Sequence, residues 1–184
     1  GCRLYEWRWK VEKTGLKQRN FTQPLWLGAE SLKNKTVLLY GEQGLGDTIQ
    51  FCRYARLVAA LGARLIMEVH KPLTGLLTGL AGVTELVVKG AMLPAFDYHC
   101  PLLSLPLAFK TNIASIPRSQ AYLCSDPNKV SKWASKLGDK TKKRVGIVWS
   151  GRAEHKNDHN RSIVLSELVA QLPQDIEYVS LQKE

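Results

Sequence analysis

The 184-residue sequence has few cysteines, no long apolar run and no low-complexity segment. Its 4 cysteines are scattered and include no C-x-x-C pair: Cys2, Cys52, Cys100 and Cys124. This spacing excludes a dense disulfide framework, and we expect buried, reduced thiols. No apolar run approaches the about 20 residues of a membrane-spanning helix, so no transmembrane segment is predicted.

The start of the chain lacks both a Met and an apolar centre. Residues 1–10 are aromatic and charged, a pattern that does not match a secretory signal. We therefore expect a cytoplasmic protein, either free or peripheral to the inner membrane. A start without Met is typical of a fragment of a longer protein.

Acidic residues are fewer than basic ones, which gives a formal net charge of +10. Phosphorylated small molecules, nucleic acids and acidic membrane surfaces all attract such a chain. Much of the basic excess lies between Lys136 and Arg144, where no aromatic residues interleave. A platform for single-stranded nucleic acid needs such aromatics, so nucleic acid is not expected as the main partner.

Apolar runs and amphipathic segments alternate along the chain, and 45% of the residues are hydrophobic. The first four predicted strands are 36–40, 64–69, 85–88 and 96–100, and the first long helix is 47–61. Alternating strands and helices indicate parallel βαβ units with right-handed crossovers. The predicted fold class is therefore α/β, with a Rossmann-like parallel sheet.

The pattern restarts after a helix that Asp126-Pro127 opens and Gly138 ends. A buried strand (144–149), a helix (163–172, capped by Ser162) and another strand (176–181) are predicted there. Two strands do not make a stable sheet alone, so they either extend the first sheet or begin a longer domain. The predicted domains are an N-terminal extension (1–34), a Rossmann-like unit (35–140) and the first βαβ of a second such unit (141–184).

The glycine turn after the first strand is the most informative segment. In a parallel sheet this turn lies at the carboxyl end of a strand, where ligands bind. Gly44 and Gly46 are expected to let the backbone take conformations that a side chain forbids. Asp47 falls at the start of the helix, where a carboxylate can cap free N–H groups. It could equally face the crevice and accept a proton, and both roles stay open.

The same turn resembles a dinucleotide-binding loop, but only in part. Its glycines follow G-x-x-G-x-G rather than G-x-G-x-x-G spacing. Glu68 lies where an acid that binds ribose is expected, whereas Glu42, Gln43 and Asp47 would repel or displace a pyrophosphate. A dinucleotide-binding oxidoreductase remains as an alternative function.

The restarted unit carries a second set of polar residues. Ser150 and Gly151 follow a strand, where small residues let a phosphate or ribose approach the backbone. Arg161 precedes a predicted helix start and could form an anion site there. His155 and His159 have a helical zinc spacing, but the segment is a loop without a third ligand, so no metal is expected.

Several segments together resemble bacterial heptosyltransferases. The closer resemblance is to the heptosyltransferase-like region that follows tetratricopeptide repeats in some bacterial proteins. The matching segments span nearly the whole chain: 5–10, 23–26, 41–51, 96–106, 148–151, 157–158, 161–163 and 180–182. The aromatic-rich opening resembles the end of the last repeat, so protein contacts through adjacent repeats are expected.

This resemblance implies an inverting, metal-independent glycosyltransferase of the GT-B type, without a cofactor. Its acceptor-side domain comes first, and a domain for the nucleotide-sugar follows. Asp47 matches the catalytic base, which takes a proton from the acceptor hydroxyl. The positions assigned to the donor phosphates are Arg161, Ser150, Gly151 and Ser162. Contact with the acceptor and stabilisation of the turn are both open for Glu42, Gln43, Gly44, Gly46 and Gln50.

The chain also departs from this family. Family members place further donor-binding segments beyond the point where this chain ends, so the fragment alone is expected to be inactive or nearly so. The sequence does not identify the donor sugar, and the acceptor is a glycan, a lipid-linked sugar or a protein. The main alternative is a non-catalytic interaction module with a glycosyltransferase-like fold.

Overall fold

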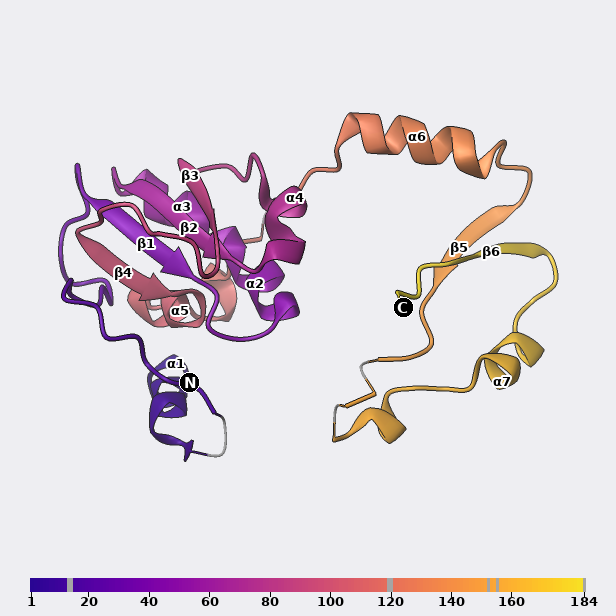
Figure 1. Cartoon of the computed structure of the whole chain (residues 1–184), viewed down its shortest axis with the longest axis horizontal. Coiled ribbons are helices and arrows are strands. Elements are labelled where there is room, and N and C mark those ends of the chain that lie inside the picture. The colour runs from indigo at the N-terminus through magenta and orange to yellow at the C-terminus, as the bar shows by residue number, and fades with distance from the viewer. Residues whose placement is uncertain (13–14, 119–120, 152, 155, 184) are drawn as a thin grey trace. The chain divides into compact units, whose positions relative to one another are not determined.

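A computed structural model of the chain describes residues 1–12, 15–118, 121–151, 153–154 and 156–183 (Figure 1). The chain divides into two compact units, Gly1–Ser125 and Asp126–Glu184. We call them the first and the second unit. The division falls before the helix that Asp126 opens, so this helix groups with the second unit.

The first unit is built on a four-stranded parallel sheet with the strand order β3-β2-β1-β4. The strands are β1 (Thr36–Tyr40), β2 (Arg64–Val69), β3 (Glu85–Val88) and β4 (Tyr98–Pro101). The first three coincide with the predicted ranges, and the α/β class with a parallel sheet is confirmed. β4 begins later than predicted because Asp97 has another role. Its carboxylate accepts a hydrogen bond from Thr36 N, at 2.7 Å.

The predicted helix 47–61 is broken into two. α2 (Leu45–Phe51) and α3 (Ala55–Ala60) are joined by a 3₁₀ turn (Cys52–Tyr54). The remaining short helices of this unit are α1 (Cys2–Tyr5), α4 (Thr74–Leu77) and α5 (Leu105–Ala108). Further 3₁₀ turns are Glu6–Lys10, Lys71–Leu73, Leu102–Ser104 and Ile113–Ser115.

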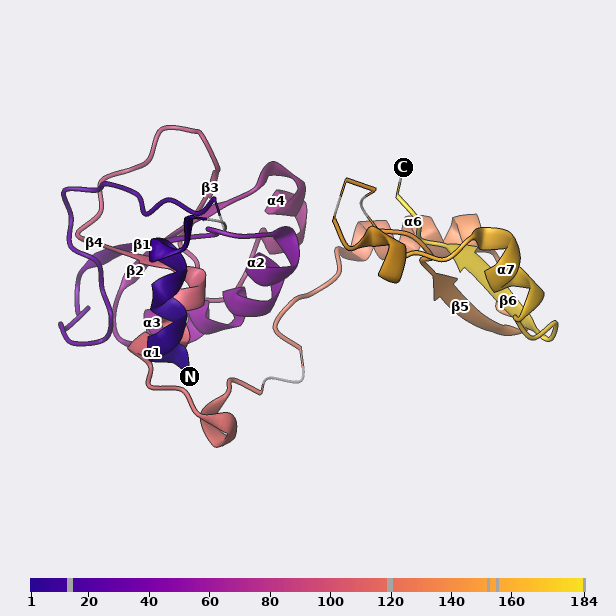
Figure 2. The same cartoon turned by 90° about the horizontal axis from the view of Figure 1, so that it is seen from below.

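The two faces of the sheet are covered differently. On one face Val37 and Leu39 pack against helix residues such as Ala55 and Val58. On the other face the buried residues are covered by irregular chain, and the cluster consists of Leu38, Tyr40, Ile66, Val87, Phe21, Leu93 and Phe96. In Figure 2 the connection from β3 to β4 crosses the side of the sheet opposite α3. The second face is therefore closed by segments that carry few backbone hydrogen bonds of their own.

The N-terminal extension is part of the first unit. Trp26 and Leu32 are buried in its core, and Trp26 N donates to His99 O at 2.9 Å beside β4. Arg8 is also buried, and it pairs with Glu42 on the turn after β1. Residues 1–34 thus supply side chains to both the core and the edge of the sheet.

The second unit contains α6 (Pro127–Leu137), β5 (Lys143–Ile147), a 3₁₀ turn (Asp158–Asn160), α7 (Leu165–Ala170) and β6 (Ile176–Ser180). β5 and β6 pair in parallel as a sheet of their own and do not extend the first sheet. Figure 1 and Figure 2 both show these two strands side by side. The expectation of a buried strand here is wrong, because β5 is at most half-buried when only one strand flanks it.

Two expected helix starts have different outcomes. Asp126 caps α6 as predicted, since its Oδ1 accepts a hydrogen bond from Asn128 N at 2.9 Å. The expected cap of α7 by Ser162 is wrong, because that helix begins later, after Val164. Among the described residues, no helix has both the length and the apolar character needed to cross a membrane.

Candidate functional site

The turn after β1 starts with a glycine that its surroundings require. Gly41 N donates to Glu68 O at 3.3 Å, which holds the turn beside the end of β2. A Cβ on Gly41 would lie 2.6 Å from Thr48 Oγ1. Thr48 is fully buried, and its hydroxyl donates to Gly44 O at 3.2 Å, so it has little room to give way. Close packing against Thr48 therefore requires a glycine, without a side chain, at position 41.

Gly44 and Gly46 do not take the unusual conformations expected of them. Gly44 has φ −71° and ψ 172°, which any residue adopts, and Gly46 lies in the first turn of α2. Neither has a positive φ. Gly44 is the residue that precedes the helix, and its role is to present its N–H to the capping side chain.

Asp47 supplies that cap. Its Oδ2 accepts a hydrogen bond from Gly44 N at 3.0 Å, which satisfies a donor at the start of α2. The side chain is half-buried, and Oδ1 makes no hydrogen bond with any other described residue. The capping role is thus observed and occupies one oxygen. The second oxygen is the atom that could accept a proton.

The two glutamines assigned to the acceptor or the turn lie at different places. Gln43 Nε2 donates to Tyr5 Oη at 2.7 Å, so this side chain ties the turn to α1. Gln50 is exposed and lines a cavity of about 390 Å³ together with Phe51 and Tyr54. The structure does not bring Gln43 and Gln50 together, and the contact of Gln43 favours a structural role.

In the second unit, three of the four residues assigned to the donor phosphates lie close together: Gly151, Arg161 and Ser162. Gly151 N donates to Ser162 Oγ at 2.9 Å, and Ser162 Oγ donates to Asp158 Oδ1 at 2.8 Å. A Cβ on Gly151 would lie 3.8 Å from Arg161 Nη2 and 3.0 Å from Asp158 Oδ1. The small residue therefore leaves room beside the exposed guanidinium of Arg161.

Ser150, the fourth of these residues, is held by the side chain of Gln182, which follows β6. Gln182 Oε1 accepts hydrogen bonds from Trp149 N and Ser150 N, at 3.3 and 3.1 Å, and Gln182 Nε2 donates to Ser150 O. The N–H of Ser150 is thus engaged rather than open to an anion. The sequence reasoning assigned no role to Gln182, although it lies within a segment that resembles the family.

Arg161 was expected to lie directly before a helix start, and this expectation is wrong. The helix α7 begins four residues after Arg161 and is only 6 residues long. Its guanidinium could bind an anion by charge and without help from a helix terminus. His155 of the proposed histidine pair lies outside the described residues. Within the described ranges, no three His, Cys, Asp or Glu side chains gather as metal ligands.

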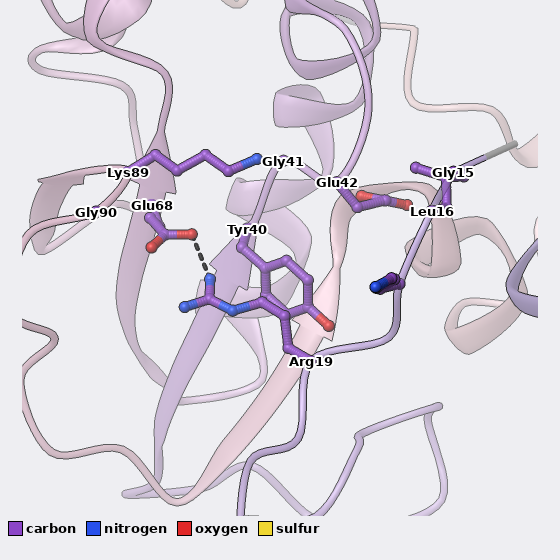
Figure 3. Close-up of a pocket in the computed structure, with 10 residues that line it drawn as sticks. Gly15, Leu16, Arg19, Tyr40, Gly41, Glu42, Glu68, Lys89 and Gly90 are labelled. Atoms are coloured by element: carbon purple, nitrogen blue, oxygen red, sulfur yellow. Dashed lines mark hydrogen bonds and ion pairs between the residues drawn. The ribbon is translucent and has the colours of Figure 1, made fainter.

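Sequence reasoning missed a cavity of about 460 Å³ at the carboxyl ends of β1, β2 and β3 (Figure 3). We call it the edge pocket; its polar lining residues are Lys17, Arg19, Tyr40, Glu42, Glu68 and Lys89. Arg19 forms an ion pair with the buried Glu68 and stacks over the ring of Phe21. Glu68, the candidate ribose-binding acid, is therefore already paired. The position of Glu68 near the end of the second predicted strand, where an acid that binds ribose is expected, indicated its importance, whereas nothing in the sequence indicated Arg19.

A buried ionic network lies behind the edge pocket. Arg8 donates to Glu6 Oε1 at 2.8 Å, to Glu42 Oε1 at 3.0 Å and to Ser104 Oγ at 2.8 Å. Glu42 also accepts a hydrogen bond from Leu103 N. Burial raises the pKa of Glu42, and the charge of Arg8 opposes this effect. The other oxygen of Glu42, Oε2, is buried and has no hydrogen-bond partner among the described residues.

Neither models of known protein families, nor curated proteins, nor solved structures give a significant match to the chain.

Proposed function

We propose that the chain is the acceptor-side half, with the beginning of the donor half, of an inverting, metal-independent GT-B glycosyltransferase. The observation that carries this proposal is the position of Asp47. Its carboxylate lies at the carboxyl edge of a parallel sheet, half-buried, with one oxygen bound to Gly44 N and the other unused by the described residues. The resemblance of the surrounding segments to heptosyltransferases supports the same role.

The chemistry would transfer a sugar from a nucleotide-sugar to an acceptor hydroxyl. Asp47 Oδ1 takes the hydroxyl proton while that oxygen attacks the anomeric carbon. The bond from the anomeric carbon to the diphosphate breaks as the new bond forms, with inversion. No cofactor takes part, and the acceptor hydroxyl belongs to a glycan, a lipid-linked sugar or a protein.

The departing diphosphate needs positive charge or N–H donors, since no metal is used. Arg161 supplies the charge, and the missing side chain of Gly151 gives a phosphate access to it. Ser162 and Ser150 are already engaged in hydrogen bonds, so their role is to fix the loop. Contacts through adjacent repeats and a cytoplasmic location, either free or peripheral to the inner membrane, remain part of this proposal.

One observation favours a second candidate, a non-catalytic interaction module with the same fold. The hydrogen bond between Asp47 Oδ2 and Gly44 N accounts for an acidic residue at this position without any catalysis. An oxidoreductase that binds a dinucleotide gains no such support, because Glu68 is paired with Arg19.

The two candidates differ in what Asp47→Asn does. The carbonyl of Asn can still accept the bond from Gly44 N but cannot take a proton, so the substitution separates the cap from the base. In the longest natural chain that contains this region, assayed with a panel of nucleotide-sugars, we expect turnover to fall about 10²-fold or more. The melting temperature should stay unchanged.

Asp97→Asn is the matched control, because Asp97 also accepts a backbone hydrogen bond and is partly exposed. Its turnover should equal that of the wild type. Unchanged turnover in Asp47→Asn would eliminate the base assignment, and a parent protein that transfers none of the sugars would favour the interaction module.

A further inference from the structure

The helix α6 of the second unit has an apolar stripe that is exposed. Val130, Trp133, Ala134 and Leu137 recur at the spacing of one helix face, and we call them the α6 stripe. All of α6 lies within the described residues, and none of its side chains is buried. Val130 and Trp133 are 52% and 51% exposed on a helix that Figure 1 shows as uninterrupted. An amphipathic helix is stabilised mainly by covering such a stripe, so a surface that covers it is expected.

Charge of one sign runs beside the stripe. Lys129, Lys132 and Lys136 each come directly before a stripe residue, so they lie together along one flank of it. All three are exposed, and none forms an ion pair with a described carboxylate. The helix contains no acidic residue. The positive charge continues beyond Gly138, with one acid among three more exposed lysines: Asp139, Lys140, Lys142 and Lys143.

This charge distinguishes between the surfaces that could cover the stripe. A second copy of α6 would place lysines against lysines, which is unfavourable. An anionic lipid surface fits both parts of the helix, since acyl chains accept the stripe and headgroup phosphates attract the lysines. The stripe also carries a tryptophan, the residue type that is enriched where a membrane meets water. Lys136 Nζ lies 4.7 Å from the ring centre of Trp133, so its stem follows the ring and its charge can reach the headgroups.

The length of α6 fixes how it can meet a bilayer. Its 11 residues span about 16 Å along the helix axis, roughly half the thickness of the hydrocarbon layer. The helix is therefore too short to cross a membrane, and it would lie along the surface. In that orientation the stripe faces the acyl chains while the lysines stay at the level of the headgroups.

We propose that α6 is a membrane-binding helix that lies on the surface of an anionic bilayer. The α6 stripe enters the boundary between headgroups and acyl chains, and Lys129, Lys132 and Lys136 bind lipid phosphates. This role selects the peripheral location over the free one. It does not rest on the proposed transferase activity, because lipid binding by α6 involves neither a sugar donor nor Asp47.

The test is flotation of the 184-residue chain with vesicles of equal parts phosphatidylglycerol and phosphatidylcholine. We expect an association constant of about 10⁴ M⁻¹, comparable to one myristoyl chain, so most of the protein should float at about 1 mM lipid. Pure phosphatidylcholine should bind about 100-fold more weakly, because the three lysines lose their partners. No flotation with the anionic vesicles would overturn the proposal.

Variants of α6 separate the stripe from the charges. Trp133→Ala should weaken binding about tenfold, and this change cannot act by melting the helix, since Ala is the better helix former. The matched control is Trp7→Ala, because Trp7 is 58% exposed and also has a lysine over its ring, at 4.4 Å. The control should bind like the wild type. Equal binding by Trp133→Ala and the wild type would contradict insertion of the stripe.

A triple variant with Lys129→Gln, Lys132→Gln and Lys136→Gln should bind about 100-fold more weakly. Its control removes the same net charge from exposed lysines of the first unit, with Lys33→Gln, Lys71→Gln and Lys110→Gln. This control should lose less than about twofold. Equal losses in the two triple variants would mean that net charge attracts the chain without a defined site, and would contradict the role of α6.

Two further readouts locate the contact. Brominated phosphatidylglycerol should quench part of the tryptophan fluorescence, and Trp133→Phe should abolish this quenching whereas Trp7→Phe should keep it. The longest natural chain that contains this region should float as the 184-residue chain does. Flotation of the 184-residue chain alone would show that further protein covers the stripe, and would overturn the proposal.

Discussion

The two units of this chain carry their candidate functional residues in different ways. In the first unit, Asp47 lies on a helix that packs on a four-stranded sheet with a buried core on both faces. In the second unit, Arg161 lies in a loop beside a two-stranded sheet, and none of the described residues there is fully buried. Packing therefore fixes the first site, whereas local hydrogen bonds fix the second.

This difference has consequences for stability. A four-stranded sheet with covered faces can bury enough apolar surface to be stable alone, but a two-stranded one is marginal. Val130 and Trp133 on α6 remain about half exposed, at 52% and 51%. We expect the second unit to open at much lower free energy than the first.

The largest effect should come from matched cavities in the two sheets. Leu39→Ala removes a fully buried side chain from β1 and should destabilise the first unit by about 2–5 kcal/mol. Ile147→Ala on β5 removes a half-buried side chain and should destabilise the second unit by less than about 1 kcal/mol. Amide hydrogen exchange, which reports on each unit separately, measures both values. Equal losses would mean that the units do not differ in packing.

A matched pair of arginines sharpens the comparison. Arg8→Gln leaves the buried Glu42 without its cation, and the first unit should lose about 3 kcal/mol. Arg144 in the second unit pairs with Glu177 at 2.8 Å, but this pair is partly exposed, so Arg144→Gln should lose less than about 1 kcal/mol. Urea unfolding monitored by amide hydrogen exchange measures the free energy of unfolding of each unit, and so the loss that each substitution causes. A loss below about 1 kcal/mol for Arg8→Gln would show that its network is not important for stability.

Arg161 should affect binding and not stability. Under the proposed function, Arg161→Ala in the longest natural chain should weaken nucleotide-sugar binding about tenfold, because a charge-assisted contact is lost. Calorimetric titration measures the affinity, and the melting temperature should not change because the side chain is exposed. An unaltered donor affinity would refute this assignment.

The smallest effect concerns acid stability of the first unit. Burial, together with the charge of Arg19, lowers the pKa of His99 below its usual value of 6.5. The unfolded chain therefore binds a proton at His99 before the folded unit does, and stability falls as the pH drops from about 6.5 toward the lowered pKa. Exchange-derived free energies at several pH values should show this fall in the wild type. In His99→Phe, the free energy of unfolding should decrease less over the same pH range, because this residue cannot bind a proton.

Local patterns were sufficient to predict the strands β1, β2 and β3, because each is an apolar, β-rich run that ends near a turn residue. The start of α6 followed from Asp126-Pro127 in the same way, and Gly138 ends it with φ +64°. These features depend only on residues that are neighbours in the sequence, so they can be predicted from a single sequence.

Contacts between distant segments could not be predicted. Arg8 meets Glu42 across 34 positions, and Arg19 meets Glu68 across 49, and no periodicity indicates either pair. Ser162 was expected to cap α7, but its hydroxyl instead bonds Asp158 four positions earlier. Both Ser and Asp serve in caps and turns, so only the fold decides between these roles.

The most direct test of the account is the turnover of Asp47→Ala in the longest natural chain, with and without added formate. The substitution removes both the cap and the base, so we predict a stability loss of about 1 kcal/mol and a turnover loss of about 10²-fold or more. Formate, an external carboxylate, should restore part of the turnover and none of the stability. Wild-type turnover in Asp47→Ala would contradict the central claim that this carboxylate takes the proton of the acceptor.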